Sequence, residues 1–264
     1  MVAFADSVGT GAPGQQRAAL GLLLPAALLV GWEAICRTGL VPAELLPAPS
    51  EIGRALLRLA ASGDLARHCG ATAARMAWGF LAGAVAGTLA GALTGASPLA
   101  RAILDPTVQG LRSVPSIAWV PLFILWLGIF ETSKISLIAV GVFFPVYLNL
   151  MTGMAQVDRR LVEVGRAHRL GRLALVRRVL VPAALPAYVT GLRSGLGLGW
   201  MFVVAAELMG ASEGLGFLLV DGQQTGRPAI VIAAILLFAL LGKLSDWALA
   251  LTGARWLAWQ DVAG

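Results

Sequence analysis

The sequence predicts an all-α polytopic membrane protein whose chain crosses the bilayer six times. Hydrophobic residues make up 58% of the 264 residues and charged residues 13%, and the mean hydropathy is +0.81. An ordinary soluble domain carries about 25% charged residues, so this composition belongs to an integral membrane protein. The apolar residues gather in runs that approach the roughly 20 residues a helix needs to cross the hydrocarbon.

Six runs are predicted to be spans, with a core at residues 70–252 and cytoplasmic ends at residues 1–16 and 253–264. The N-terminal end is small, polar and glycine-rich, and we expect it to be disordered. The first run is an uncleaved span and not a secretory signal, because Glu33 and Arg37 follow it and no small-residue cleavage site does. The predicted spans are residues 17–37, 71–96, 101–128, 135–154, 187–209 and 229–251.

Residues 38–69 are predicted to form a periplasmic loop with a short helix at the membrane interface. Ser50 is a good N-cap, and Leu56, Leu57 and Leu59 mark one helical face. A helix of this length cannot cross the bilayer.

The net charge of +6 does not indicate nucleic-acid binding. The excess arginines lie in one cluster and beside apolar runs, a distribution typical of the positive-inside rule. Cys36 and Cys69 have no metal-binding or disulfide-framework spacing, and we interpret both as small apolar side chains. The chain has no GxxxxGK[ST] motif and no convincing catalytic constellation, and His168 is expected to be solvated and structural. An enzyme and a metal site are therefore not predicted.

Glycine recurs at every fourth position of the second predicted span. This period puts the small residues on one helical face, where another helix backbone can approach closely. We interpret the stripe as a packing seam, within the chain or with a partner subunit; a ligand channel is the alternative. The stripe consists of Gly79, Gly83, Gly87, Gly91 and Gly95.

The third predicted span carries charge and proline, so it is a candidate for lining a translocation pathway. Residues 116–128 alone are too short to cross, and starting at residue 101 brings Asp105 and Arg112 into the span. Buried charge is costly and marks functional sites in membranes. One hypothesis is that Arg112 attracts an anionic substrate; the alternative is that it pairs with Asp105 or snorkels to the headgroups.

The last two spans also contain charged residues. Arg193 lies in the first half of the fifth span and Glu207 near its end. Glu207 and Glu213 are interpreted either as part of a gate or binding-protein contact, or as solvated ends. Lys243 and Asp246 are spaced to pair on one face of the sixth span.

An arginine-rich stretch at residues 158–186 separates the fourth and fifth spans. Its apolar residues alternate with seven arginines at helical spacing, which predicts one or two amphipathic helices. Pro182 and Pro186 are expected to end them, because proline removes a backbone donor. Such a segment either docks onto a partner or only fixes orientation as a cytoplasmic loop.

Several motifs resemble the inner-membrane permease subunits of ATP-binding-cassette importers. Glu163 to Ala167, Gly171 and Val181 to Ala183 are similar to the family's EAA loop, although Val164 and Gly165 replace its two alanines. This variant is similar to the nitrate, sulfonate and taurine branch, and most of all to its aliphatic-sulfonate permeases. The resemblance covers residues 70–259 and includes LRSVPSIAWVPLFILWLGI (111–129), FPVYLN (144–149), GLGFLL (214–219) and LLGKLSD (240–246).

The resemblance implies a type I importer permease fold in the bacterial inner membrane, with both termini cytoplasmic. Implied partners are a second permease copy, two cytoplasmic ATPase subunits that bind ATP and Mg²⁺, a periplasmic binding protein and membrane lipid. The chain itself would hold no cofactor. The implied ATPase-coupling residues are Glu163, Val164, Gly165, Arg166, Ala167, His168, Arg169, Gly171 and Arg172. Pathway candidates are Arg112, Ser116, Trp119 and Arg193, and candidates for a short periplasmic gate are Glu207, Glu213, Gly214 and Gly216.

The substrate expected from this branch is a small anion, with aliphatic sulfonate or taurine ahead of nitrate and bicarbonate. Two other classes of protein remain as alternatives. An ion-coupled secondary transporter would show inverted repeats or a carboxylate relay, and neither is visible in the sequence. A purely structural membrane scaffold would carry no transport activity.

Overall fold

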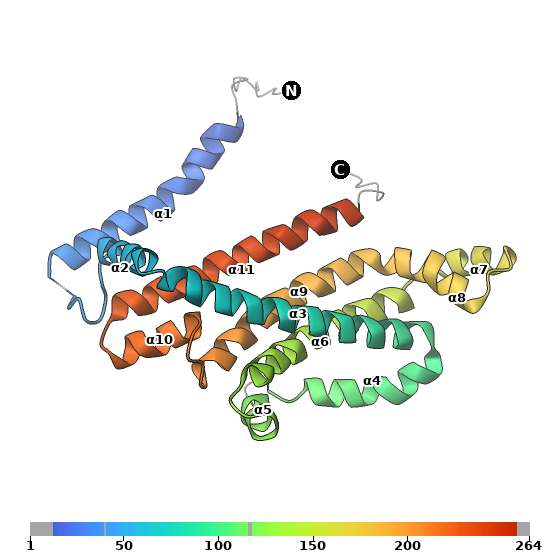
Figure 1. Cartoon of the computed structure of the whole chain (residues 1–264). Helices are drawn as coiled ribbons and strands as arrows, with labels where there is room; N and C mark the ends of the chain where they lie inside the picture. Colours follow the sequence, from blue (N-terminus) through green and yellow to red (C-terminus); the bar gives the residue numbers. More distant parts are fainter. Residues whose placement is uncertain (1–12, 40, 116–117, 258–264) are drawn as a thin grey trace, which may run out of the picture.

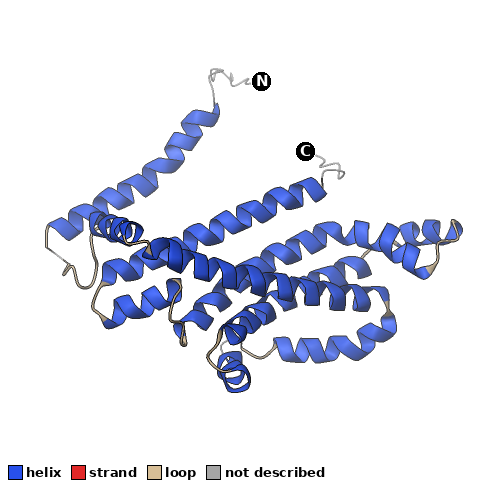
Figure 2. Cartoon of the chain, viewed as in Figure 1, coloured by secondary structure: helices blue, strands red, loops and turns tan. Residues whose placement is uncertain are grey.

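The computed structural model describes residues 13–39, 41–115 and 118–257, and each secondary-structure element that it assigns there is a helix (Figures 1 and 2). The all-α prediction is thereby confirmed. The elements are α1 (Pro13–Arg37), α2 (Pro49–Ala61), α3 (Asp64–Ala96), α4 (Pro98–Arg112), α5 (Trp119–Leu127), α6 (Glu131–Ala155), α7 (Arg159–Ala167), α8 (Arg172–Leu175), the π-helical turn η2 (Val176–Leu180), α9 (Val181–Leu208), α10 (Leu215–Gln224) and α11 (Pro228–Trp256).

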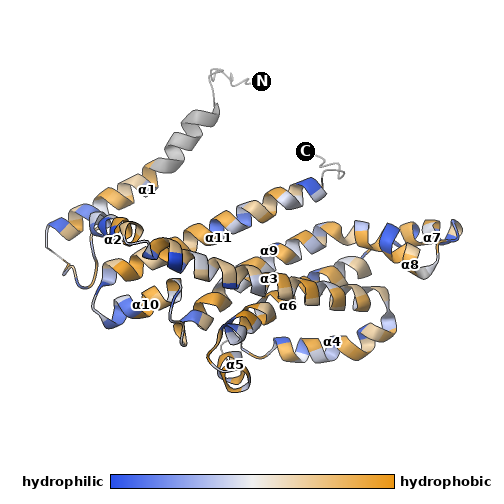
Figure 3. Ribbon diagram, viewed as in Figure 1, coloured by the Kyte–Doolittle hydropathy of each residue, from blue (hydrophilic) through white to orange (hydrophobic). Residues whose placement is uncertain are grey.

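Four helical segments in the described residues are long and apolar enough to cross a membrane. They are Asp64–Ala96, Glu131–Ala155, Leu173–Leu208 and Pro228–Trp256. Figure 3 shows apolar residues along these segments and hydrophilic residues gathered near α2, α10 and α7. The first predicted span corresponds to α1, which is 25 residues long and begins at Pro13. The disorder expected for residues 1–16 is wrong for residues 13–16, which form the start of α1, while residues 1–12 and 258–264 lie outside the described residues.

The core of the bundle is built by α3, α6 and α9, which pack side by side (Figure 1). Ile138, Val142 and Val146 of α6 are fully buried between α3 and α9. Val203 of α9 is also fully buried in this core. Because α6 packs against α3 on one side and α9 on the other, it is the central helix of the bundle.

The glycine stripe of α3 is a packing seam within the chain. A Cβ atom added at Gly87 would lie 2.8 Å from the carbonyl oxygen of Phe143, and one at Gly91 would lie 2.8 Å from that of Tyr147. The α6 backbone therefore occupies the space that side chains would need, as in small-residue packing of membrane helices. The channel interpretation does not hold, because α6 fills that face.

The third predicted span is not one helix. Residues 101–128 are divided between α4, which ends at Arg112, and α5, which begins at Trp119. Pro115 accounts for the break, because proline disfavours the helical conformation of the residue before it and cannot donate a backbone hydrogen bond. At 15 and 9 residues, neither helix alone has the length of a span. A count of six single-helix spans is therefore not reached.

Pro182 and Pro186, in the last part of the arginine-rich stretch, do not end a helix. Helical backbone continues from α8 through η2 into α9. In η2 the N–H of Val181 bonds to the carbonyl of Val176, five residues earlier. Pro182 follows directly after this π-helical turn, which changes the backbone hydrogen-bond pattern at that point, and Pro186 is accepted inside the helix.

The N-terminal elements are joined by a polar contact that the sequence did not predict. The N-cap of α2 is Ala48 and not Ser50. Ser50 instead donates to Glu33 of α1 through its backbone N–H (3.0 Å) and through its hydroxyl (2.9 Å). Glu33 thus ties α2 to α1, which projects away from the rest of the bundle (Figure 1).

Candidate functional site

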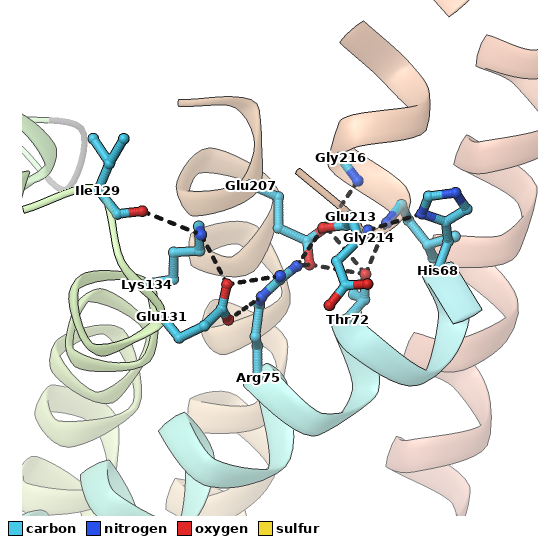
Figure 4. Close-up of polar contacts among 11 residues, drawn as sticks. His68, Thr72, Arg75, Ile129, Glu131, Lys134, Glu207, Glu213, Gly214 and Gly216 are labelled. Atoms are coloured by element: carbon cyan, nitrogen blue, oxygen red, sulfur yellow. Dashed lines mark hydrogen bonds and ion pairs between the residues drawn. The ribbon is translucent and has the colours of Figure 1, made fainter. Parts of the chain in front are cut away.

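A network of charged side chains joins α3, α6, α9 and α10 at one end of the bundle (Figure 4). We call it the Arg75 network. It lies where α3 has just begun, α6 begins, α9 ends and α10 begins, so residues far apart in the sequence meet. Its side chains are those of His68, Thr72, Arg75, Glu131, Lys134 and Glu207.

Arg75 is the centre of the network. Its guanidinium donates two parallel hydrogen bonds to Glu131, from Nε to Oε2 and from Nη2 to Oε1 (2.9 Å). Its Nη1 donates to Glu207 Oε1 (2.7 Å) and to the backbone oxygen of Glu213 (2.6 Å). The side chain of Arg75 is 3% exposed and that of Glu207 is 0% exposed. This pair is therefore screened from water, and each charge depends on the other.

The charges of the network balance. Lys134 is also buried, and its ammonium donates to Glu131 Oε1 (2.9 Å) and, over 3.4 Å, to the backbone oxygen of Ile129. Two cations thus face the carboxylates of Glu131 and Glu207. Glu131 is 54% exposed, so the network reaches the surface at the first turn of α6. Buried membrane charge persists only with such pairing.

The network also holds the beginning of α10. The first N–H groups of a helix have no partner within it, and the N-cap of α10 is a glycine with no side chain to offer. Side chains of α3 and α9 supply the missing acceptors. The pairs are Gly214 N with His68 Nδ1 (3.0 Å), Leu215 N with Thr72 Oγ1 (2.8 Å) and Gly216 N with Glu207 Oε2 (2.8 Å).

Two glycines allow α10 to approach this closely. Gly214 has a φ of +119°, and a Cβ there would lie 2.6 Å from both Arg75 Nη1 and Glu207 Oε1. A Cβ at Gly216 would collide with the side chain of Glu207. Both glycines of the GLG sequence are therefore required by contact with the charged pair.

These positions correct one interpretation and extend the set of candidate residues. Glu207 is not a solvated end but a fully buried partner of Arg75, and Glu213 is half-buried and contributes its backbone oxygen. The sequence analysis missed the roles of the partners on α3 and α6. Arg75 carried a usable signal, because it is a cation within the predicted span 71–96. The partners missed are His68, Thr72, Arg75, Glu131 and Lys134.

The predicted pathway residues divide into two groups. Arg112 and Trp119 come together and line a cavity of about 420 Å³ beside α6 and α9. Arg112 does not pair with Asp105, which instead accepts a hydrogen bond from the hydroxyl of Tyr147 (3.0 Å). Ser116 lies outside the described residues.

Arg193 is directed elsewhere, to α11. It forms two bonds with Asp246, Nε to Oδ1 and Nη2 to Oδ2, each of 2.9 Å. The expected pairing of Lys243 with Asp246 is wrong, because the ion pair that Asp246 forms among the described residues is with Arg193. Among the described residues, no group of three or more His, Cys, Asp or Glu side chains is placed to hold a metal ion.

The predicted coupling residues form a helical hairpin, α7–α8, at the opposite end of the bundle from α10 (Figure 1). The N-cap of α7 is Asp158, whose carboxylate accepts from Arg160 N (2.9 Å). Glu163 does not cap the helix but pairs with Arg159 (3.0 Å) on its exposed face.

Arg169 closes α7 in the left-handed conformation, with a φ of +55°. The Leu170 N–H bonds to the Gly165 carbonyl (3.1 Å) and the Arg169 N–H to the Arg166 carbonyl (2.8 Å), which is the Schellman ending that glycine usually provides. Residues 166–169 are all exposed. The turn therefore presents two arginines and a histidine at the tip of the hairpin.

The chain matches the family model described as "Binding-protein-dependent transport system inner membrane component" over residues 79–257. The chain belongs to this family. Its members are the permease subunits of ATP-binding-cassette importers, and the sequence resemblance is confirmed.

Two relatives and one solved structure show how far the similarity extends. The aliphatic sulfonates transport permease protein SsuC of Bacillus subtilis is 42% identical over 241 residues, covering 91% of this chain and 87% of that protein. The taurine transport system permease protein TauC of Escherichia coli is 32% identical, covering 89% and 87%. A chain of the MetNI methionine ABC transporter superposes with a TM-score of 0.56 at 22% identity, covering 70% and 95%, which shows a shared fold.

Proposed function

We propose that this permease moves a small organic anion, an aliphatic sulfonate or taurine, into the cell at the expense of ATP hydrolysed by partner subunits. The sulfonate and taurine permeases to which it is similar support this substrate class. Nitrate and bicarbonate are the alternatives within the same branch. The working assembly would contain a second permease copy, two ATPase subunits carrying ATP and Mg²⁺, and a periplasmic binding protein.

The α7–α8 hairpin is the proposed contact with the ATPase subunits and therefore lies in the cytoplasm, as do both termini. The main support for this proposal is that the hairpin, although rich in arginine, also exposes large apolar side chains. Leu161 is 50% exposed, Val164 56% and Leu173 81%. Beside them lies an open groove of about 810 Å³ that includes Gly165 and His168. An exposed apolar patch rimmed by charge is typical of a protein interface.

The Arg75 network then lies at the periplasmic end, where we assign it to the gate. Its side chains hold the first turn of α10, so they fix the position of the gate segment relative to α3, α6 and α9. Closure of the ATPase pair would move the hairpin, and the packed helices would carry that motion to the network. Arg112 and Trp119 lie between the two ends and are assigned to the pathway.

Replacing Gly165 tests the coupling contact. Gly165 is buried in the hairpin, where an added Cβ would lie 2.6 Å from Leu175 Cδ1. Gly165→Leu should displace α7 and uncouple the complex, so that ATP is hydrolysed without uptake of the solute. Gly53→Leu is the matched control, because nothing lies within 4 Å of a Cβ at that position.

A second variant distinguishes a lost contact with the ATPase from misfolding of the permease. Arg169→Glu reverses a charge at the exposed tip without adding bulk to the interior, and it should weaken ATPase binding to the permease in a pull-down. Normal uptake by the Gly165 variant, together with normal ATPase binding by the Arg169 variant, would remove the hairpin from the coupling mechanism.

A further inference from the structure

The cavity of about 420 Å³ opens between the α4–α5 connection and the facing sides of α6 and α9. Its volume is within the range of about 300–1,000 Å³ that small-molecule sites occupy. The wall combines polar side chains from α4 and α6 with aromatic rings from α5, α6 and α9. The residues that decide its chemistry are Arg112, Trp119, Phe144, Asn149 and Phe202.

Arg112 is the only charged residue among the described residues that line this cavity. Its guanidinium makes one long hydrogen bond, of 3.5 Å, to Gln109 Oε1. A guanidinium of this kind can bind an oxyanion through two N–H groups at once. Asn149 uses one amide N–H on the Pro145 carbonyl (2.8 Å) and has a second to donate. The polar side of the cavity is therefore suited to an anion.

The remaining wall is apolar. Trp119, Phe144 and Phe202 contribute aromatic surface, and no aspartate or glutamate is among the described lining residues. An anion without an apolar group would make no apolar contact with these rings. An ammonium group would find no carboxylate among the described lining residues, and cation–π contact with the rings offsets only part of the cost of removing it from water. The wall thus favours an anion with an uncharged apolar body.

The depth of the cavity suits a translocation pathway. Its α6 lining runs from Gly141 to Asn149, which are 10 and 18 residues beyond Glu131 in a helix of 25 residues. At 1.5 Å per residue this is roughly 15–27 Å along the helix, so the cavity begins near the middle of a hydrocarbon layer of about 30 Å and extends toward the α7–α8 end. Transporter sites are commonly found at this depth beside interrupted helices, and the interruption between α4 and α5 borders this cavity.

We propose that this cavity is a transient site for the organic anion in the permease itself, and that it selects short alkanesulfonates over taurine and nitrate. Arg112 binds the sulfonate oxygens, and Trp119, Phe144 and Phe202 contact the alkyl chain. Nitrate has no alkyl chain, and the taurine ammonium has no acidic partner in the wall. This inference rests on the proposed importer function and narrows its substrate class.

The test is direct binding to the assembled permease–ATPase complex in lipid nanodiscs without the binding protein, which would otherwise impose its own selectivity. Butane-1-sulfonate, taurine and nitrate are titrated by calorimetry. The proposal expects butane-1-sulfonate to bind at least tenfold more tightly than the other two. Arg112→Gln should weaken its binding at least tenfold, Arg112→Lys by less, and Arg54→Gln, far from the cavity on α2, should leave it unchanged.

Equal affinity for the three anions, undetectable binding of butane-1-sulfonate, or binding indifferent to Arg112→Gln would overturn the cavity assignment. Stimulation of the ATPase by loaded binding protein is measured on the same complex. If that stimulation is present while the cavity predictions fail, the importer function stands and only the site is wrong. If the permease forms no ATPase complex, the proposed function itself fails.

Discussion

Replacing Arg75 by glutamine removes the cation that neutralises a carboxylate buried in the membrane protein. Glu207 would keep its bonds to Thr72 and Gly216 but would lose its charged partner while its side chain stays 0% exposed. Glu131 would suffer less, because it is 54% exposed and keeps Lys134. Most of the loss of stability in this variant therefore comes from the unpaired carboxylate of Glu207.

Removing one partner of a buried ion pair costs about 3–5 kcal/mol. Since Glu207 retains two hydrogen bonds, we expect the lower part of this range, about 3–4 kcal/mol. For a chain of this size 1 kcal/mol shifts Tm by about 2–4 °C, so Arg75→Gln should lower Tm by roughly 6–16 °C. The measurement is thermal unfolding of the purified permease in nanodiscs. Arg54→Gln is the control, because Arg54 forms only an exposed 3.9 Å pair with Glu51.

A double variant separates lost charge balance from lost packing. Glu207→Gln combined with Arg75→Gln leaves no uncompensated charge, and the glutamine can still accept from Gly216 N. Part of the lost Tm should therefore return. If Arg75→Gln is as stable as Arg54→Gln, or if the double variant is no more stable than the single one, the network does not hold α10 by charge pairing.

Two further variants test the packing of the bundle. Gly87→Ala should destabilise the permease by about 1–3 kcal/mol, because the added methyl group collides with the α6 backbone. Gly110→Ala on α4 is the control: no atom lies within 4 Å of the added Cβ, so this change should be neutral or stabilising. Equal Tm values for the two variants would contradict close packing of the α3 glycines on α6. Arg193→Gln should lower Tm, because Asp246 loses both of its bonds to the guanidinium, and adding Asp246→Asn should recover part of the loss. If Tm does not recover, charge pairing is not what Arg193 contributes to stability.

The sequence predicted the features that depend on local composition and period. The apolar runs located the long helices, and the four-residue glycine period of α3 indicated a seam that the structure confirms against α6. The basic stretch was correctly read as short helices. In each case the signal lies within one continuous segment, so no knowledge of tertiary contacts was needed.

The remaining features depend on contacts between distant segments. Nothing near Glu207 in the sequence shows that Arg75 neutralises it, so its burial could not be inferred from the end of a span. Pro115 and Pro182 look alike as helix breakers, yet the first interrupts a helix and the second is accommodated behind a π-helical turn. Arg169 took the left-handed position where glycine is the usual residue, although Gly171 lies two positions on. Tertiary packing decided each of these outcomes.

In the proposed mechanism, the tip of the α7–α8 hairpin contacts an ATPase subunit inside the cell. This contact is tested most directly by cross-linking from Arg169→Cys in the full importer complex, with the free thiols of Cys36 and Cys69 first removed by substitution with alanine. We expect a cross-link to the ATPase subunit and no labelling of this position by a membrane-impermeant thiol reagent added outside the cell. Labelling from outside, or a cross-link to the binding protein in place of the ATPase, would contradict it.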